Sequence, residues 1–196
     1  MPPVPPVPPP LPLPPPSEPN GAPAVLVTEL GVRVGETTAA SWCADLLAGA
    51  DVHAYAHMLA YLGRNCATAA FDSGWHEYWH RTWGGRGLLY VWSGAVSGVV
   101  VAGLADEHWR PAEMCLKVAT KREIGEAGPG AVPLATHELP RVRTNAIRCL
   151  GVVGDTEHVA VVDAAVDDAD SAVRRAAARA LTLMARRLDL DLPDRR

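Results

Sequence analysis

Residues 140–151 (PRVRTNAIRCLG) and residues 171–182 (SAVRRAAARALT) carry one pattern twice, 31 residues apart. The matching apolar positions are Val142, Ala146, Cys149 and Leu150 in the first copy and Val173, Ala177, Ala180 and Leu181 in the second. Steps of three and four residues place these side chains on one face of an α-helix. The stretch therefore predicts two equivalent helices that each bury one side.

Weaker copies of this pattern precede the two clear ones at the same interval. The matching positions are His80, Gly84, Gly87, Leu88 and Val91, then Pro111, Cys115, Val118, Ala119 and Arg122. A fixed period of about 20 to 50 residues with helical spacing inside it is typical of a solenoid, whose units bury their apolar faces only by stacking. The sequence therefore predicts an all-α fold, an α-solenoid of antiparallel helical pairs with a 31-residue period.

Each of these helices is expected to be followed by a second one. The expected second helices span about residues 95–105, 129–137 and 157–167. Proline inside a helix removes a backbone donor, although the first turn tolerates it. Because Pro129 and Pro133 interrupt the middle copy, we expect a shortened second helix there, starting near Pro129 or Ala131.

The expected domain organisation has three parts. Residues 75–190 form the repeats, and residues 37–74 form a degenerate N-terminal helical cap, since solenoids end in atypical units. Within this cap we expect one helix to begin at Thr37 or Thr38 and the next at Asp51.

Residues 1–36 are expected to form a disordered Pro-rich tail and linker. Thirteen prolines lie within residues 1–23. Because proline fixes φ and lacks an amide donor, we expect an extended, solvated polyproline II segment there. Residues 24–36 (AVLVTELGVRVGE) have some β character but no obvious pairing partner, so the sequence leaves their structure open.

The composition excludes several classes of partner. The chain is 48% hydrophobic with a net charge of −4, whereas nucleic-acid-binding surfaces usually show clustered positive charge. No apolar run approaches the roughly 18 residues of a membrane span, and the N-terminus lacks the features of a secretion signal. We therefore expect no nucleic-acid partner, no membrane association and a cytoplasmic location.

The cysteines also favour a cytoplasmic location. The four cysteines are Cys43, Cys66, Cys115 and Cys149. They show no CxxC spacing and fall mainly on apolar helix positions, so we expect buried, reduced thiols.

The two clear copies resemble the HEAT repeat. The features that carry this resemblance are Val142-Arg143 and Val173-Arg174 near the helix starts, Leu150-Gly151, and the acidic turn at residues 167–170. The likeness is to the short form seen in phycobilisome-lyase-like proteins, and it covers about residues 75–188. It implies an α-solenoid that serves mostly as a scaffold for protein partners, although a few such proteins are enzymes.

One motif suggests metal chemistry. Residues 76–80 (HEYWH) match HExxH, a spacing that on a helix lets His76 and His80 bind Zn²⁺ while Glu77 activates water. In the 31-residue register, however, His80 aligns with Val142 at a helix start, which places His76 in the preceding turn. A zinc-dependent hydrolase is therefore the alternative function, and no catalytic residue, metal or cofactor is assigned.

Two further features mark candidate partner-binding residues. The first is an aromatic cluster, led by Trp75, Trp79 and Trp83, which fills either the core or an exposed groove. The second is a cation at one equivalent position in four successive copies: Arg86, Lys117, Arg148 and Arg179. Stacked repeats would align these cations into a ladder for an acidic partner. The alternative is a solvated outer face paired with acids such as Glu113 and Asp155.

The function expected from these patterns is a non-enzymatic protein–protein interaction scaffold or adaptor, with a protein partner of unknown identity. The second helices are expected to form its concave docking surface, with the proline tail as a second contact. Arg143 and Arg174 are expected to bond acids of the turn that precedes each helix, which would fix the repeat spacing.

Overall fold

Three long helices form the framework of the C-terminal part of the chain in this computed structural model, which describes residues 13–69, 71 and 76–191. The helices are α7 (Trp109–Arg122), α9 (Pro140–Val153) and α11 (Ser171–Leu188). Their first residues are 31 positions apart.

Each long helix begins with a residue that favours a helix N-terminus, either a side chain that caps the first turn or a proline. The carboxylate of Asp170 accepts the amides of Ala172 and Val173 and caps α11. The ring of His108 accepts the amide of Arg110 at the start of α7. Helix α9 starts instead with proline, whose missing N–H would be unpaired at this position in any case.

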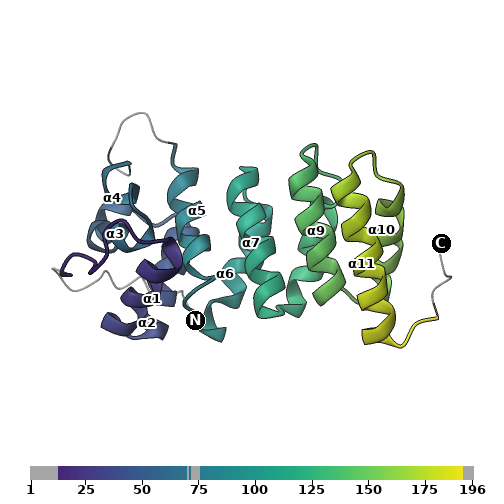
Figure 1. Cartoon of the computed structure of the whole chain (residues 1–196), viewed down its shortest axis with the longest axis horizontal. Coiled ribbons are helices and arrows are strands. Elements are labelled where there is room, and N and C mark those ends of the chain that lie inside the picture. The colour runs from purple at the N-terminus through teal and green to yellow at the C-terminus, as the bar shows by residue number, and fades with distance from the viewer. Residues whose placement is uncertain (1–12, 70, 72–75, 192–196) are drawn as a thin grey trace, which may run out of the picture. The chain divides into compact units, whose positions relative to one another are not determined.

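The three helices pack side by side in chain order, α7 on α9 and α9 on α11 (Figure 1). Val142 and Val173, which the repeat pattern pairs, are both 0% exposed. A Cβ atom at Gly151 of α9 would stand 2.7 Å from the Cβ of Ala180 on α11. Only glycine therefore permits this approach of the two helices, because close-packed interiors leave no room for an added methyl group.

Shorter helical segments alternate with the long helices along the chain. The segment before α7 is α6 (Ser97–Ala102), and those after α7 and α9 are α8 (Gly128–Leu134) and α10 (Val159–Ala164). They are opened by the 3-10 turns η2 (Gly94–Val96), η4 (Gly125–Ala127) and η5 (Thr156–His158). Further 3-10 turns, η3 (Gly103–Ala105) and η6 (Ala165–Asp167), continue α6 and α10. No such turn is described after α8, which contains Pro133. The middle segment thus ends early, and it begins at Gly128, next to the expected Pro129.

The N-terminal part is also helical. Its elements are α1 (Pro23–Val34), α2 (Glu36–Leu47), η1 (Val52–Met58), α3 (Leu59–Leu62), α4 (Cys66–Ala69) and α5 (Tyr78–Gly87). Helix α2 packs directly on α5, because a Cβ at Gly84 would collide with the backbone of Cys43 and one at Gly87 with its sulfur. These glycines thus leave room for the neighbouring helix α2.

Residues 23–34, most of which the sequence assigned to a linker of open structure, form α1. Pro23 occupies its first turn, and Leu26, Val27 and Leu30 are buried along one side. The chain before α1 also contacts this region, since the hydroxyl of Tyr61 donates to the carbonyl of Pro14 at 2.6 Å. Residues 1–12, the rest of the expected tail, lie outside the described residues.

The chain divides after Gly103 into two units. This boundary falls inside the range that the sequence assigned to the repeats. Within the described residues the regular structure is helical throughout, which confirms the all-α prediction. None of the described helices combines the length and the apolar character needed to cross a lipid bilayer.

Candidate partner-binding surfaces

The tryptophans of α5 line a hollow in the N-terminal unit. Trp79, Trp83 and Arg86 follow one another on one side of α5 and border an open cavity of about 560 Å³, with the start of α1 and the turn after α3 opposite. Trp83 is 3% exposed and belongs to the core, whereas Trp79 is half-buried. Trp75, the third tryptophan of the predicted set, lies outside the described residues.

Arg86 holds the turn after α3 in place. Its Nη2 donates to the carbonyl of Leu62 at 2.6 Å and lies 3.6 Å from the sulfur of Cys66. A Cβ at Gly63 would stand 2.9 Å from the same nitrogen, so glycine makes room for the guanidinium. Burial raises the pKa of the Cys66 thiol to about 11, although the charge of Arg86 acts in the opposite direction. The thiol is therefore protonated near neutral pH and a poor nucleophile.

The HExxH match does not lie within one helix. Helix α5 begins at Tyr78, so exposed His76 precedes it and stacks on the ring of Tyr78 at 5.3 Å between centroids. His80 is half-buried, with its ring 5.5 Å from that of Trp83. Among the residues that the structure describes, no three His, Cys, Asp or Glu side chains are grouped so that they could hold a metal ion.

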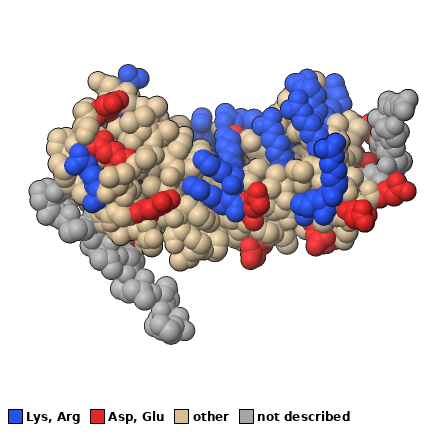
Figure 2. All heavy atoms as spheres, turned by 60° about the horizontal axis from the view of Figure 1, so that its bottom comes forward, with Lys and Arg blue, Asp and Glu red and all other residues tan. Residues whose placement is uncertain are grey.

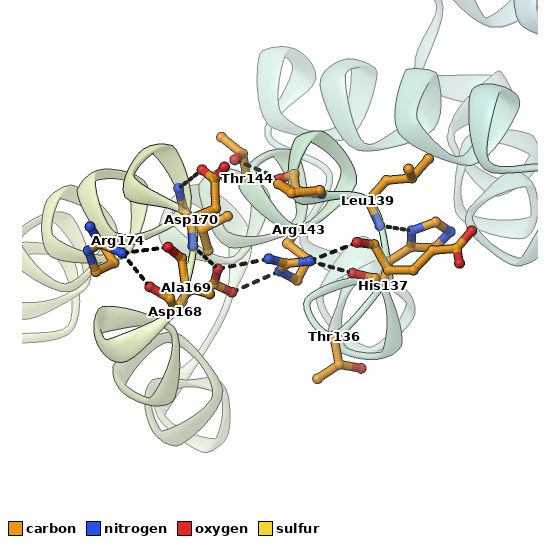
Figure 3. Close-up of polar contacts among 12 residues, drawn as sticks. Thr136, His137, Leu139, Arg143, Thr144, Asp168, Ala169, Asp170 and Arg174 are labelled. Atoms are coloured by element: carbon orange, nitrogen blue, oxygen red, sulfur yellow. Dashed lines mark hydrogen bonds and ion pairs between the residues drawn. The ribbon is translucent and has the colours of Figure 1, made fainter.

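In the C-terminal unit, Arg143 ties two turns together (Figure 3). Its Nε and Nη2 each donate to one carboxylate oxygen of Asp168 at 2.8 Å, and its Nη1 donates to the carbonyls of His137 and Glu138 at 2.9 and 3.0 Å. Arg174, 31 residues further on, donates to two carbonyls of its own preceding turn at 2.6 and 2.8 Å. We call the Arg143–Asp168 pair the clamp.

The clamp differs from the prediction that Arg143 binds an acid of the preceding turn. It also determines the charge state of Arg143 and Asp168. The acid that Arg143 binds lies in the following turn, not in the preceding one, because packing of α9 on α11 brings Asp168 alongside it. Hydrogen bonds from Arg143 lower the pKa of Asp168, despite partial burial, and the charge of Arg174 adds to this effect. The same hydrogen bonds raise the pKa of Arg143. Both groups therefore stay charged near neutral pH.

An open hollow of about 630 Å³ lies beside the clamp. Ala160, Val161 and Ala164 of α10 supply small apolar side chains to it, and Arg143 and Asp168 belong to its polar edge. The donors of Arg143 are already committed to Asp168 and to backbone carbonyls. We call this hollow the α10 groove; its lining is suited to apolar side chains of a bound segment.

The other members of the predicted cation ladder lie one on each long helix. Lys117 is paired with Glu113 on α7, with its Nζ 2.9 Å from Oε1. Arg148 on α9 and Arg179 on α11 are exposed, and neither has a hydrogen bond or ion pair within the described part of the chain. The structure thus places two unpaired cations on neighbouring helices, and the predicted alternative of pairing with Glu113 applies to Lys117.

Charge is divided sharply among the elements of the C-terminal unit. All twelve Lys and Arg residues between positions 104 and 191 lie in α7, α9 and α11, whereas thirteen of the fourteen Asp and Glu residues in that range lie outside these helices. Figure 2 shows Lys and Arg side chains gathered over this part of the chain, with Asp and Glu toward its lower edge. The predicted ladder considered only one cation in each repeat and therefore did not include this division of charge. A count of charged residues in each predicted helix would have found it.

The exception among the acids is Glu113, which is 4% exposed. Its carboxylate accepts hydrogen bonds from Arg141 at 2.8 and 3.0 Å and from Asn145 at 2.9 Å, in addition to the pair with Lys117. The guanidinium of Arg141 also lies 4.9 Å from the ring centre of Trp109. This cluster joins α7 to α9 and neutralises cations at that end of the unit.

One comparison with known families finds a match in the C-terminal part of the chain. A family model for HEAT repeats matches residues 101–192, a range that contains α7 to α11, the clamp and the α10 groove. A search of curated proteins returns no match to the chain.

Proposed function

We propose that this chain is a HEAT-repeat protein and a non-enzymatic adaptor that binds other proteins, since a family model for HEAT repeats matches residues 101–192. HEAT repeats commonly serve as protein-interaction scaffolds. We further propose that its helical pairs stack as a solenoid with a 31-residue period. In support, α5, α7, α9 and α11 start at intervals of 31 residues, and so do α6, α8 and α10.

The observation that carries the proposal is the α10 groove. It is lined mainly by α10 and by the turn after α8, and small side chains such as Ala160 and Ala164 leave it open. The clamp fixes one edge, so the groove is formed before a partner arrives and little ordering is needed on binding. Its volume of about 630 Å³ lies within the usual range for binding sites.

The occupant that fits this groove is an extended segment of a partner protein with apolar side chains. The helices α8 and α10 contain no Lys or Arg, and Asp163 is their only charged residue. Exposed Glu138 borders the groove, and the charges of Arg143 and Asp168 at its edge are paired with each other. An apolar segment flanked by a basic residue would therefore meet complementary charge.

The test blocks the groove without disturbing the fold. Ala164→Trp fills the groove from an exposed position on α10, and Ala178→Trp adds the same bulk at an exposed position on α11, outside it. We expect the wild-type chain and Ala178→Trp to capture the same partner from extracts of the native cell, and Ala164→Trp to lose it. Equal capture by both variants would refute docking in the groove.

We also place the adaptor in the cytoplasm. All four cysteines are buried and none forms a disulfide. Four unpaired thiols suit a reducing compartment.

A further inference from the structure

We propose that a second surface of the adaptor binds an acidic protein segment. This basic face consists of Arg148 on α9 and Arg175, Arg179 and Arg186 on α11. All four side chains belong to exposed residues. The inference goes beyond the docking function of the α10 groove, because none of these arginines lines that groove.

The arginines of α11 form one stripe. Arg175, Arg179 and Arg186 lie at positions i, i+4 and i+11, which fall within about 40° of one another around a helix of 3.6 residues per turn. The buried residues Val173 and Ala177 lie on the other side of the helix. The stripe therefore points away from the packed interior.

Among the residues that the structure describes, these cations have no acidic partner. Helix α11 contains five arginines and no acid. Arg179 and Arg186 have no hydrogen bond or ion pair in the described part of the chain, and Arg175 donates only to the hydroxyl of Ser171, at 3.1 Å. Like charges four residues apart on a helix repel one another. A docked anionic segment would relieve this repulsion, so the face gains free energy from such a partner.

Packing of α9 on α11 extends the stripe into a patch. Gly151 meets Ala180 at van der Waals distance or closer, so the helix axes lie at the close end of the usual range of about 8–10 Å. Arg148 stands one turn before Gly151, and Arg179 directly precedes Ala180. Both cations therefore lie beside the closest approach of the two helices, with no acid from either helix between them.

The spacing of the cations favours carboxylates on a polypeptide. Arg179 and Arg186 are seven residues apart, which is about 10 Å along the helix, and Arg148 lies on the adjacent helix at about 8–10 Å between axes. Acidic side chains on every seventh residue of a helix, or every third residue of an extended chain, repeat at about 10 Å. Nucleic-acid phosphates repeat at about 3.4 Å of rise per strand, so cations about 10 Å apart would leave most phosphates of a bound strand unpaired.

The division of charge then gives the adaptor two chemically different sides. The α10 groove is bordered by exposed Glu138 and by the paired Arg143 and Asp168, whereas the basic face carries only arginines. The C-terminal unit can thus bind two partners of opposite charge at different surfaces, because each surface attracts a partner of opposite charge and repels one of like charge.

Fluorescence anisotropy on the full chain tests the basic face. The probe is a fluorescein-labelled peptide of about fourteen residues with glutamate at every third position, compared with its glutamine analogue in about 0.15 M salt. We expect the glutamate peptide to bind and the glutamine peptide not to bind. Arg148→Glu and Arg179→Glu should each weaken binding several-fold, and the double variant at least about tenfold. Arg64→Glu, at an exposed position in the N-terminal unit, changes the net charge equally and should bind as the wild type does.

Three results would overturn the proposal. The first is equal affinity for the glutamate and glutamine peptides, and the second is equal weakening by Arg64→Glu and Arg179→Glu. The third is tighter binding of a single-stranded oligonucleotide of the same charge, lost in the double variant, which would assign the face to nucleic acid. Circular dichroism verifies that each variant is folded. Ala164→Trp should bind the glutamate peptide normally, so failure of the groove and failure of the basic face are separate outcomes.

Discussion

Asp168→Asn is the most direct test of the clamp that borders the α10 groove. The carboxylate of Asp168 accepts two hydrogen bonds from Arg143 at 2.8 Å and one from the amide of Asp170 at 2.8 Å. The substitution keeps the size of the side chain and one oxygen acceptor. It removes the negative charge and turns the other oxygen into a donor that faces the guanidinium.

The expected loss lies between that of an exposed ion pair and that of a charged hydrogen bond. Exposed pairs contribute at most about 1 kcal/mol, and hydrogen bonds to charged groups about 1.5–3 kcal/mol. The clamp side chains are only 15% and 13% exposed. We therefore expect the free energy of unfolding to fall by about 2 kcal/mol, and Tm by about 4–8 °C in a chain of this size.

The loss should depend on pH in one direction. Arg143 holds the pKa of Asp168 below its ordinary value in the folded chain. The contribution of the pair is therefore complete above the ordinary aspartate pKa of about 4, and it is lost as the pH falls through the lower pKa of the folded state. The difference in Tm between the wild type and Asp168→Asn should be constant from about pH 5 to 7 and should shrink below about pH 4.

Thermal denaturation followed by circular dichroism measures both effects. The control is Asp167→Asn, which removes the same charge from an exposed neighbour with no described hydrogen bond. We expect this control to unfold with the wild type. A Tm for Asp168→Asn that equals that of the control, or a difference that does not change with pH, would refute the assignment of the clamp.

Three further predictions concern other parts of the chain. Glu113→Gln should lower the free energy of unfolding by about 1–3 kcal/mol in urea titrations, because Lys117 and Arg141 lose the buried carboxylate that they share; an unchanged midpoint would contradict this. Thiol titration with Ellman's reagent at about pH 8 should label the folded chain slowly and the denatured chain at four sites, because burial raises the pKa of every thiol, for example that of Cys43 to about 12; rapid labelling of the folded chain would disprove it. Purified protein should contain no stoichiometric zinc, and His80→Ala should not change its metal content; zinc at one equivalent that disappears in this variant would revive the hydrolase alternative.

The long helices could be predicted because their apolar periodicity is local. Val142 and Val173 are buried as the pattern requires, and Asp51 caps η1 as expected by accepting the amide of His53. Helix α1 could not be assigned, because valines within residues 24–36 favour strands as much as helices when the packing partner is unknown. Tertiary contacts with α2 and α3 decide in favour of the helix.

The candidate site was only partly predictable because its residues come from different elements. The presence of a cation at both position 148 and position 179 could be predicted from the repeat. Whether Arg143 binds the preceding or the following turn depends on how α9 packs on α11. The α10 groove likewise depends on Ala160 and Ala164 being exposed rather than covered. Sequence spacing fixes positions within one helix, whereas these features depend on the distance between helices.

The direct contact of α9 with α11 is the claim on which the clamp and the basic face both depend, and a double-mutant cycle at Gly151 and Ala180 tests it. Gly151→Ala should lower the free energy of unfolding by about 1–3 kcal/mol through overpacking, and Ala180→Gly by about 1 kcal/mol through loss of helix propensity. We predict that the double variant is more stable than the sum of the two losses by at least about 0.5 kcal/mol, because removing one methyl group makes room for the other. Losses that add within about 0.3 kcal/mol would show that the two positions do not touch, and would contradict the account.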